Sequence, residues 1–285
     1  MKLSSAVEPV VFRLKHVLQL AFLPTLGAIF RKPTLLIRPR QVSAIFFSHV
    51  WAVYGDEIDA GLRDVKTMLI TPNARNGHTA HYLDRQKVTR YVAIEPNELM
   101  HASIRRHANA AGFYESDSTL LILACGAEDI PSILRAMARV DPPASGPQPD
   151  SAYQPEQPAN TIVSFLSLCT VPRPEHTIAG LVRDVLKSGG NFITHEHVLS
   201  HRQDVAWWQG FWAPIWALVF DGCRMDRPID VWVRELVLDN GIYEERKATG
   251  DESPESAWVE TKLWQDEGEM EERLIWHSGG VFTKR

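Results

Sequence analysis

Three consecutive residues with side chains suited to chemistry, His195, Glu196 and His197, directly follow a short segment, Asn191 to Thr194, that is predicted to be a strand. In parallel α/β sheets, ligands bind at the carboxyl ends of the strands, so a substrate would lie beside these residues. Alternation along the strand would place the two histidines on one face and Glu196 on the other. Either histidine could act as a general base or donate a hydrogen bond to a substrate carbonyl. The alternative is structural: one histidine satisfies a backbone carbonyl and Glu196 braces a loop.

The histidine pair could also bind a metal ion, but the sequence shows no third ligand beside it. The three cysteines, Cys125, Cys169 and Cys223, are far apart in the chain and form no CxxC pair. This usage argues against a zinc site or a disulfide framework and favours a reducing intracellular compartment. We therefore predict no metal site and a cytoplasmic protein.

A second group of residues suited to binding is aromatic. Trp208, Trp212 and Trp216 recur every four residues, so in a helix they would form one apolar stripe. Such stripes usually pack in a core. However, Asp204 and Gln209 interrupt the segment, and aromatic walls with few polar groups bind large hydrophobic molecules. The three tryptophans therefore predict a substrate-binding wall.

The stretch 66–97 supplies the first elements that must position these residues. It reads as a strand, a polar turn, a short helix and a second strand, at 68–70, 71–77, 80–83 and 91–94. This is a mononucleotide-binding βαβ half. In such a unit the acid that ends the second strand accepts hydrogen bonds from ribose hydroxyls, and here that acid is Glu95.

The rest of the chain continues the alternation of strands and helices. Further strands are predicted at 120–123, 161–166 and 191–194, helices at 41–64, 99–112, 130–140 and 181–186, and a final strand pair at 258–263 and 274–282. The pattern predicts an α/β fold, a doubly wound Rossmann-like sheet that ends in an antiparallel hairpin. We expect residues 1–64 to form an N-terminal helical extension, and residues 65–285 to form the α/β domain with a Pro-rich surface loop at 141–160.

Composition limits the partners. The chain has 285 residues, enough for one large core, and 30 Lys plus Arg against 35 Asp plus Glu give a net charge of -5, which argues against nucleic acid. The apolar run Val17 to Phe30 contains Pro24 and is shorter than the roughly 20 residues of a spanning helix. It predicts a lid over a pocket, a helix packed on the core, or an interfacial helix in peripheral contact with an internal membrane.

The order of these signals resembles the class I methyltransferases that use S-adenosylmethionine (SAM). More narrowly, it resembles the small methyltransferase-like family that includes vertebrate membrane-associated thiol methyltransferases and their fungal relatives. The segments that carry the resemblance are 91–97 with Met100, 166–171, 182–190, 196–198 and 216–224. The resemblance implies that Glu95 holds the ribose and that Ala127 and Glu128 lie at the adenine edge. It also implies that Leu166 to Leu168 line the floor beside the sulfonium of SAM and that Glu196 and His197 face the substrate. Leu168 and Cys169 are therefore predicted substrate contacts.

The polar turn departs from the family's acid-x-Gly-x-Gly-x-Gly loop. The register set by Gly77 places Thr71 at the acidic position, and Asn73 and Arg75 at the first two glycines of this cofactor-binding loop. An arginine at the middle glycine would occupy space that the methionine end of SAM needs. Arg75 and His78 could instead donate hydrogen bonds to a substrate.

Two activities therefore compete. The preferred one is a cyclase or pericyclase that needs no cofactor and acts on a hydrophobic polyketide- or terpenoid-like substrate, through restraint by the tryptophan wall and hydrogen-bond activation of a carbonyl. It is preferred because three substitutions fall together in the turn while Glu95 is kept. The alternative is a SAM-dependent O-, S- or C-methyltransferase in which a histidine or Glu196 deprotonates the acceptor. A third interpretation is a non-catalytic pseudoenzyme that binds a partner through its N-terminus.

Overall fold

The computed structural model describes residues 3–53, 78–140, 158–238, 255–265 and 272–285. Several predicted features lie outside these ranges: the first strand at 68–70, the turn residues Thr71, Asn73, Arg75 and Gly77, most of the Pro-rich loop, and the boundary at residue 64. His78 begins the 3-10 helix η3 (His78–Tyr82), but its side chain is not described. The roles proposed for these residues stay predictions.

The described strands form two sheets with the orders β1-β2 and β3-β4-β6-β5. Their bounds are Tyr91–Ile94 (β1), Leu120–Leu123 (β2), Ala159–Phe165 (β3), Leu186–His197 (β4), Trp258–Trp264 (β5) and His277–Lys284 (β6). The β1-β2 and β3-β4 pairs are parallel, whereas β6 runs antiparallel to both β4 and β5. The predicted parallel sheet with an antiparallel C-terminal hairpin is therefore confirmed.

The two sheets share one apolar core. Tyr91 and Ala93 of β1 belong to the same buried cluster as Val163 of β3 and Ile193 of β4. Consecutive residues of each strand are buried, so both faces are covered, as expected for parallel strands between helices. The strands therefore act as one framework whose carboxyl ends can build a site together.

Helices cover this framework. Their bounds are Leu3–Val17 (α1), Leu18–Phe22 (η1), Leu23–Arg31 (α2), Pro33–Ile37 (η2), Pro39–Val53 (α3), Glu98–Ala110 (α5), Ile130–Val140 (α6), Pro174–Gly180 (α7), Leu181–Val185 (η4), Gln203–Val219 (α8) and Ile229–Arg234 (α9). Local sequence explains where several begin: the Asn97 side chain accepts a hydrogen bond from Leu99 N at 3.2 Å, and Asp129 accepts one from Ser132 N at 3.2 Å.

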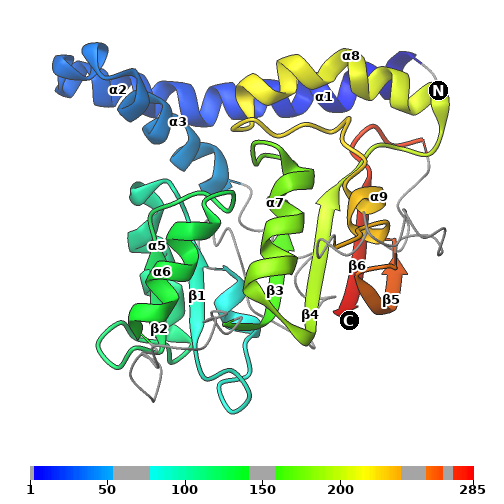
Figure 1. Cartoon of the computed structure of the whole chain (residues 1–285). Helices are drawn as coiled ribbons and strands as arrows, with labels where there is room; N and C mark the ends of the chain where they lie inside the picture. The colour runs from blue at the N-terminus through cyan, green and yellow to red at the C-terminus, as the bar shows by residue number, and fades with distance from the viewer. Residues whose placement is uncertain (1–2, 54–77, 141–157, 239–254, 266–271) are drawn as a thin grey trace.

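The helices α1 and α8 lie side by side along the edge of the molecule at which β4 ends (Figure 1). Val10 and Val17 of α1 share a buried cluster with Ala213 and Trp216 of α8. The N-terminal helices therefore pack near the carboxyl ends of the parallel strands, where ligands bind in such sheets. None of the helices in the described ranges is long and apolar enough to cross a membrane.

Candidate functional site

A cavity of about 250 Å³ lies against the carboxyl ends of β1 and β2 and the loop that follows β3. The segments that follow β1, β2 and β3 all contribute to its walls. The wall residues include Glu95, Asn97, Met100, Gly126, Ala127, Glu128, Thr170 and Val171. Because this is the edge of a doubly wound sheet at which ligands bind, the cavity is the leading candidate for a binding site.

Glu95 is the buried acid of this cavity. It directly follows β1, its side chain is 5% exposed, and one carboxylate oxygen accepts a hydrogen bond from Asn97 N at 2.8 Å. Its backbone is also fixed, because Glu95 N donates to Leu123 O at 2.9 Å and the His101 ring lies 2.7 Å from Glu95 O. A carboxylate held this firmly can accept hydrogen bonds from a pair of ribose hydroxyls.

The far wall is formed by the turn after β2. Ala127 is buried and Glu128 is exposed, and their place at the adenine edge stays a prediction. A Cβ at Gly126 would collide with the Glu128 carboxylate, so the glycine lets that side chain fold back over the turn. With Met100 opposite, the cavity combines a buried carboxylate with apolar walls, and its residues fit an adenosyl group.

Glu196 fastens the loop after β3 to β4. Its Oε1 accepts hydrogen bonds from Ser164 Oγ at 2.6 Å and Ser167 N at 3.0 Å, and its Oε2 accepts one from Cys169 N at 3.3 Å. Burial raises the pKa of Glu196, and these hydrogen bonds act in the opposite direction. Since Thr170 and Val171 of this loop line the cavity, Glu196 positions one of its walls.

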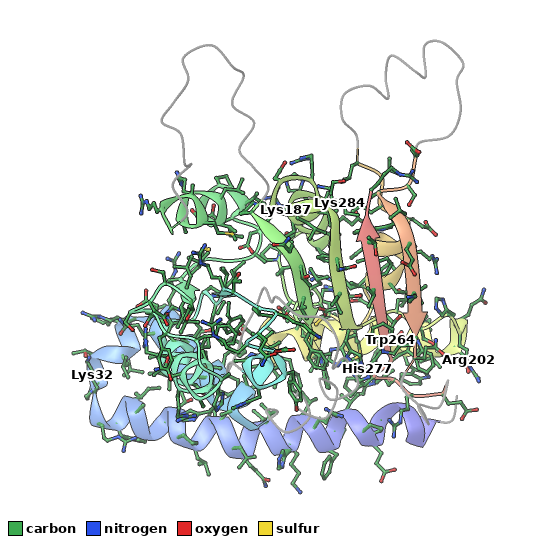
Figure 2. All side chains as sticks on the ribbon, turned by 90° about the horizontal axis from the view of Figure 1, so that it is seen from below. Lys32, Lys187, Arg202, Trp264, His277 and Lys284 are labelled. Atoms are coloured by element: carbon green, nitrogen blue, oxygen red, sulfur yellow. The ribbon has the colours of Figure 1, made fainter. Side chains whose placement is uncertain are left out.

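The other two residues of the His-Glu-His series lie on the opposite face of β4, as alternation predicts. The His195 ring stacks on Phe165 at 4.7 Å between centroids and lies 5.4 Å from the ring of His277, which is 4.7 Å from His197. Figure 2 shows His277 and Lys284 at the two opposite ends of β6. His195, Glu196 and His197 all belong to the described part of the chain, and none of them lines the Glu95 cavity. Their catalytic roles therefore stay predictions.

Two cysteines from distant parts of the sequence meet His197. Cys169 Sγ lies 3.7 Å and Cys223 Sγ 3.3 Å from His197 Nδ1, and the two sulfur atoms are 3.3 Å apart. This corrects the expectation that no third ligand lies near the histidines: the loops after β3 and α8 converge on the end of β4. Burial opposes ionisation of Cys223, but hydrogen bonds from Cys169 and His197 and the nearby imidazole lower its thiol pKa well below the ordinary value.

The tryptophan stripe packs between helices. Trp216 is 2% exposed and stacks on Phe220 at 3.9 Å between ring centroids, and Trp208 and Trp212 pack against the same cluster, which includes α1 residues. Gln209, fully buried, accepts a hydrogen bond from Ser200 N at 2.8 Å and donates to Val198 O and Leu274 O. None of these side chains lines the Glu95 cavity, so the substrate-binding wall stays a prediction.

The remaining predicted substrate contacts, Leu168 and Cys169, are both buried: Leu168 lies in the central core cluster and Cys169 in the cluster beneath α8. Neither lines the cavity itself, although the next residue, Thr170, does. The hydrogen bonds of Glu196 to the loop after β3 agree with the structural alternative, in which Glu196 braces a loop. The bracing role of Gln209 in α8 was missed, and only its polarity within an apolar segment pointed to a buried hydrogen-bonding function.

Comparison with known proteins supports the fold. An O-methyltransferase family protein from Burkholderia thailandensis is 9% identical, with a TM-score of 0.50 over 95% of this chain and 71% of that chain. The chain has the class I methyltransferase fold. No family model matches the sequence.

One curated relative shares part of the sequence. The human thiol S-methyltransferase TMT1A is 36% identical over 72 residues, which are 24% of this chain and 28% of that protein. The chain thus matches little more than a quarter of the length of this relative. The [4+2]-cyclase SpnF is also similar, at 17% identity over 52% of this chain and 46% of that chain, but its TM-score of 0.33 carries no argument for cyclisation.

Proposed function

We propose that this protein is a SAM-dependent methyltransferase of a hydrophobic small molecule, with a thiol as the first acceptor group to test. One observation carries the proposal: the buried carboxylate of Glu95 lies at the carboxyl end of β1, in a cavity that extends to the turn after β2. The partial match to a thiol S-methyltransferase favours sulfur as the acceptor atom. SAM, when bound, would supply an electrophilic methyl group.

Different residues of the cavity would bind different parts of SAM. Glu95 would accept hydrogen bonds from the ribose hydroxyls, and Met100 and Ala127 would contact the adenine through apolar atoms. Thr170 and Val171 would form the wall toward the acceptor, in a loop that Glu196 holds in place. The helices α1 and α8, packed near the same edge, would keep water from the reacting groups.

The cyclase interpretation, which the sequence favoured, is not the better supported one. It depended on turn residues 71–77, which lie outside the described residues. The similarity to a cyclase is too low to weigh against the similarity to methyltransferases. The expectation that no cofactor is needed is likewise not the better supported one, although Thr71, Asn73 and Arg75 still depart from the family's loop.

Calorimetric titration with SAM and S-adenosylhomocysteine tests the proposal. We expect wild-type protein to bind both, and Glu95→Ala to bind roughly tenfold to hundredfold more weakly, because hydrogen bonds to a buried charge are lost. Glu98→Ala is the matched control, since Glu98 is exposed and does not line the cavity. Release of S-adenosylhomocysteine with hydrophobic thiols, phenols and amines then identifies the acceptor. Absence of binding by wild-type protein would refute the proposal and restore the cofactor-free alternative.

We further propose that the N-terminal helices contact an anionic membrane surface from which a hydrophobic substrate is taken. Residues 1–53 contain seven lysines and arginines and one acid, Glu8, although the whole chain is acidic. Their exposed apolar side chains include Phe12, Phe30 and Ile37, the last two at 82% and 80% exposure. Apolar side chains flanked by basic ones are typical of helices that bind in the interface of anionic lipids.

Vesicle flotation tests this contact. We expect binding to vesicles that contain phosphatidylserine, weaker binding to phosphatidylcholine alone, and loss of binding in a Phe30→Ser, Ile37→Ser variant. Val259→Ser is the control, because Val259 is 58% exposed on β5, far from the N-terminal helices in the chain. Equal flotation of the double variant and the control would refute the proposal.

A further inference from the structure

We propose that Cys169, His197 and Cys223 form a zinc site, with two thiolates and one imidazole nitrogen as ligands. The three residues come from separate elements: the loop after β3, the end of β4 and the loop after α8. All are buried, with exposures of 0%, 8% and 1%, and their ligand atoms lie within 4.8 Å of one another. The site differs from the Glu95 cavity, which none of the three lines.

The distances between the ligand atoms lie within about 0.5 Å of those of a zinc centre. With Zn–S near 2.3 Å and Zn–N near 2.0 Å, a tetrahedral ion separates two sulfurs by about 3.8 Å and a sulfur from a nitrogen by about 3.5 Å. The corresponding distances here are 3.3 Å between the sulfurs, and 3.3 and 3.7 Å from the sulfurs to His197 Nδ1. Shifts of a few tenths of an ångström would complete the geometry.

The backbone already holds the ligands together. Arg224 N, next to Cys223, donates to Cys169 O at 2.9 Å, which joins the two cysteine loops directly. Arg227 Nη1 donates to the same carbonyl at 2.8 Å and to Val171 O at 2.9 Å. Glu196 holds Cys169 N from the other side. Such contacts around a metal site keep its ligands oriented, so less ordering is needed when the ion binds.

The donor set selects a borderline or soft transition metal. Thiolate and imidazole suit zinc, whereas calcium and magnesium require oxygen ligands. Binding releases two protons to solvent, one from Cys169 and one from the hydrogen-bonded Cys223–His197 pair, and the two thiolates then balance the two positive charges of the ion. The site is therefore neutral when loaded, which a buried position tolerates far better than a net charge. Three protein ligands leave a fourth position for water or another donor.

The test uses the full chain, purified in reducing buffer without chelator. Elemental analysis measures zinc per chain, and the stripped protein is titrated with Co²⁺, which reports thiolate ligands by charge-transfer absorption and a tetrahedral site by its visible bands. Cys169→Ser and Cys223→Ser remove ligands. Cys125→Ser is the matched control, because Cys125 is the third cysteine and lies outside the cluster.

We expect close to one zinc per chain in wild type and Cys125→Ser, and the cobalt–thiolate absorption in both. Each ligand variant should bind at least about a hundredfold more weakly, since even the partners of metal ligands contribute tenfold to hundredfold. If a ligand variant does not fold, the cobalt spectrum of the wild-type protein still tests the proposal. The proposal is overturned by absence of that spectrum in folded wild-type protein, by its loss in Cys125→Ser, or by a Cys169–Cys223 disulfide in the freshly purified reduced protein.

Discussion

Replacement of Glu196 by glutamine tests whether the carboxylate of this residue holds the loop after β3. In wild-type protein the side-chain oxygens of Glu196 accept hydrogen bonds from the Ser164 hydroxyl and from backbone N–H groups of the loop, those of Ser167 and Cys169 among them. An ionised carboxylate can accept all of these hydrogen bonds, whereas a glutamine has one accepting oxygen. The variant therefore changes the hydrogen bonding of the side chain with almost no change in its shape.

The loss can be estimated from the geometry. The amide oxygen of glutamine would take the place of Oε1 and keep the bonds from Ser164 and Ser167, which are the shorter two. Its NH₂ group would then face Cys169 N–H, which loses its acceptor. One buried donor without a partner costs about 1–3 kcal/mol. Glu196→Ala leaves all of these donors without an acceptor and should cost more, about 3–5 kcal/mol.

Urea unfolding followed by far-ultraviolet circular dichroism measures both variants, with Glu260→Gln on the exposed side of β5 as the control. The control should lie within about 0.5 kcal/mol of wild type. The reasoning would be wrong if Glu196→Gln were as stable as wild type or more stable, because relief from burying a charge would then exceed the lost hydrogen bond. It would also be wrong if Glu196→Ala unfolded no more easily than Glu196→Gln.

Two further predictions concern helix positions. The Asp129 side chain caps α6, so Asp129→Ala should lower the unfolding free energy by about 1 kcal/mol and Asp129→Asn by much less. Hydrogen bonds from Ser132 lower the pKa of Asp129, so its contribution is present above the ordinary carboxyl pKa and is lost as the pH falls through the lowered value; urea titrations at several pH values should show this loss in wild type and not in Asp129→Asn. Gln209→Leu leaves three backbone groups without their partner and should cost roughly 3 kcal/mol or more, measured against Gln203→Leu at an exposed position of the same helix; equal stability of Gln209→Leu and wild type would contradict the bracing role.

Much of the fold could be predicted from local patterns. The helix at 130–140 and the strand at 120–123 have the predicted bounds, because each is a single apolar pattern with clear breaks. The boundary near the glycines was predicted wrongly. Lys187 to Gly190 predicted the end of a helix, and the strand was expected to begin at Asn191, but β4 begins at Leu186. There the chain turns with Gly189 at positive φ. Leu186, which precedes the turn, already pairs with Ala159 of β3.

The candidate site was predictable only where one residue follows one strand. Glu95 was found because an acid that ends a buried strand is itself a local signal, and it is indeed buried beside a cavity. The His-Glu-His series was found in the same way, and alternation correctly divided it between the two faces of β4. The local sequence pattern could not predict which groups surround each face of β4, because this depends on which loops cover that face.

The Cys169–His197–Cys223 cluster shows why. Its members are separated by 28 and 26 residues, so no spacing rule for metal ligands applies to them. They meet because β3 and β4 are adjacent parallel strands that end at the same edge, and because the loop after α8 returns to that edge, where Arg224 N binds Cys169 O. A ligand set assembled by sheet order is visible only once the order is known. Cysteines that are scattered in the sequence are therefore weak grounds for excluding a metal site in a doubly wound fold.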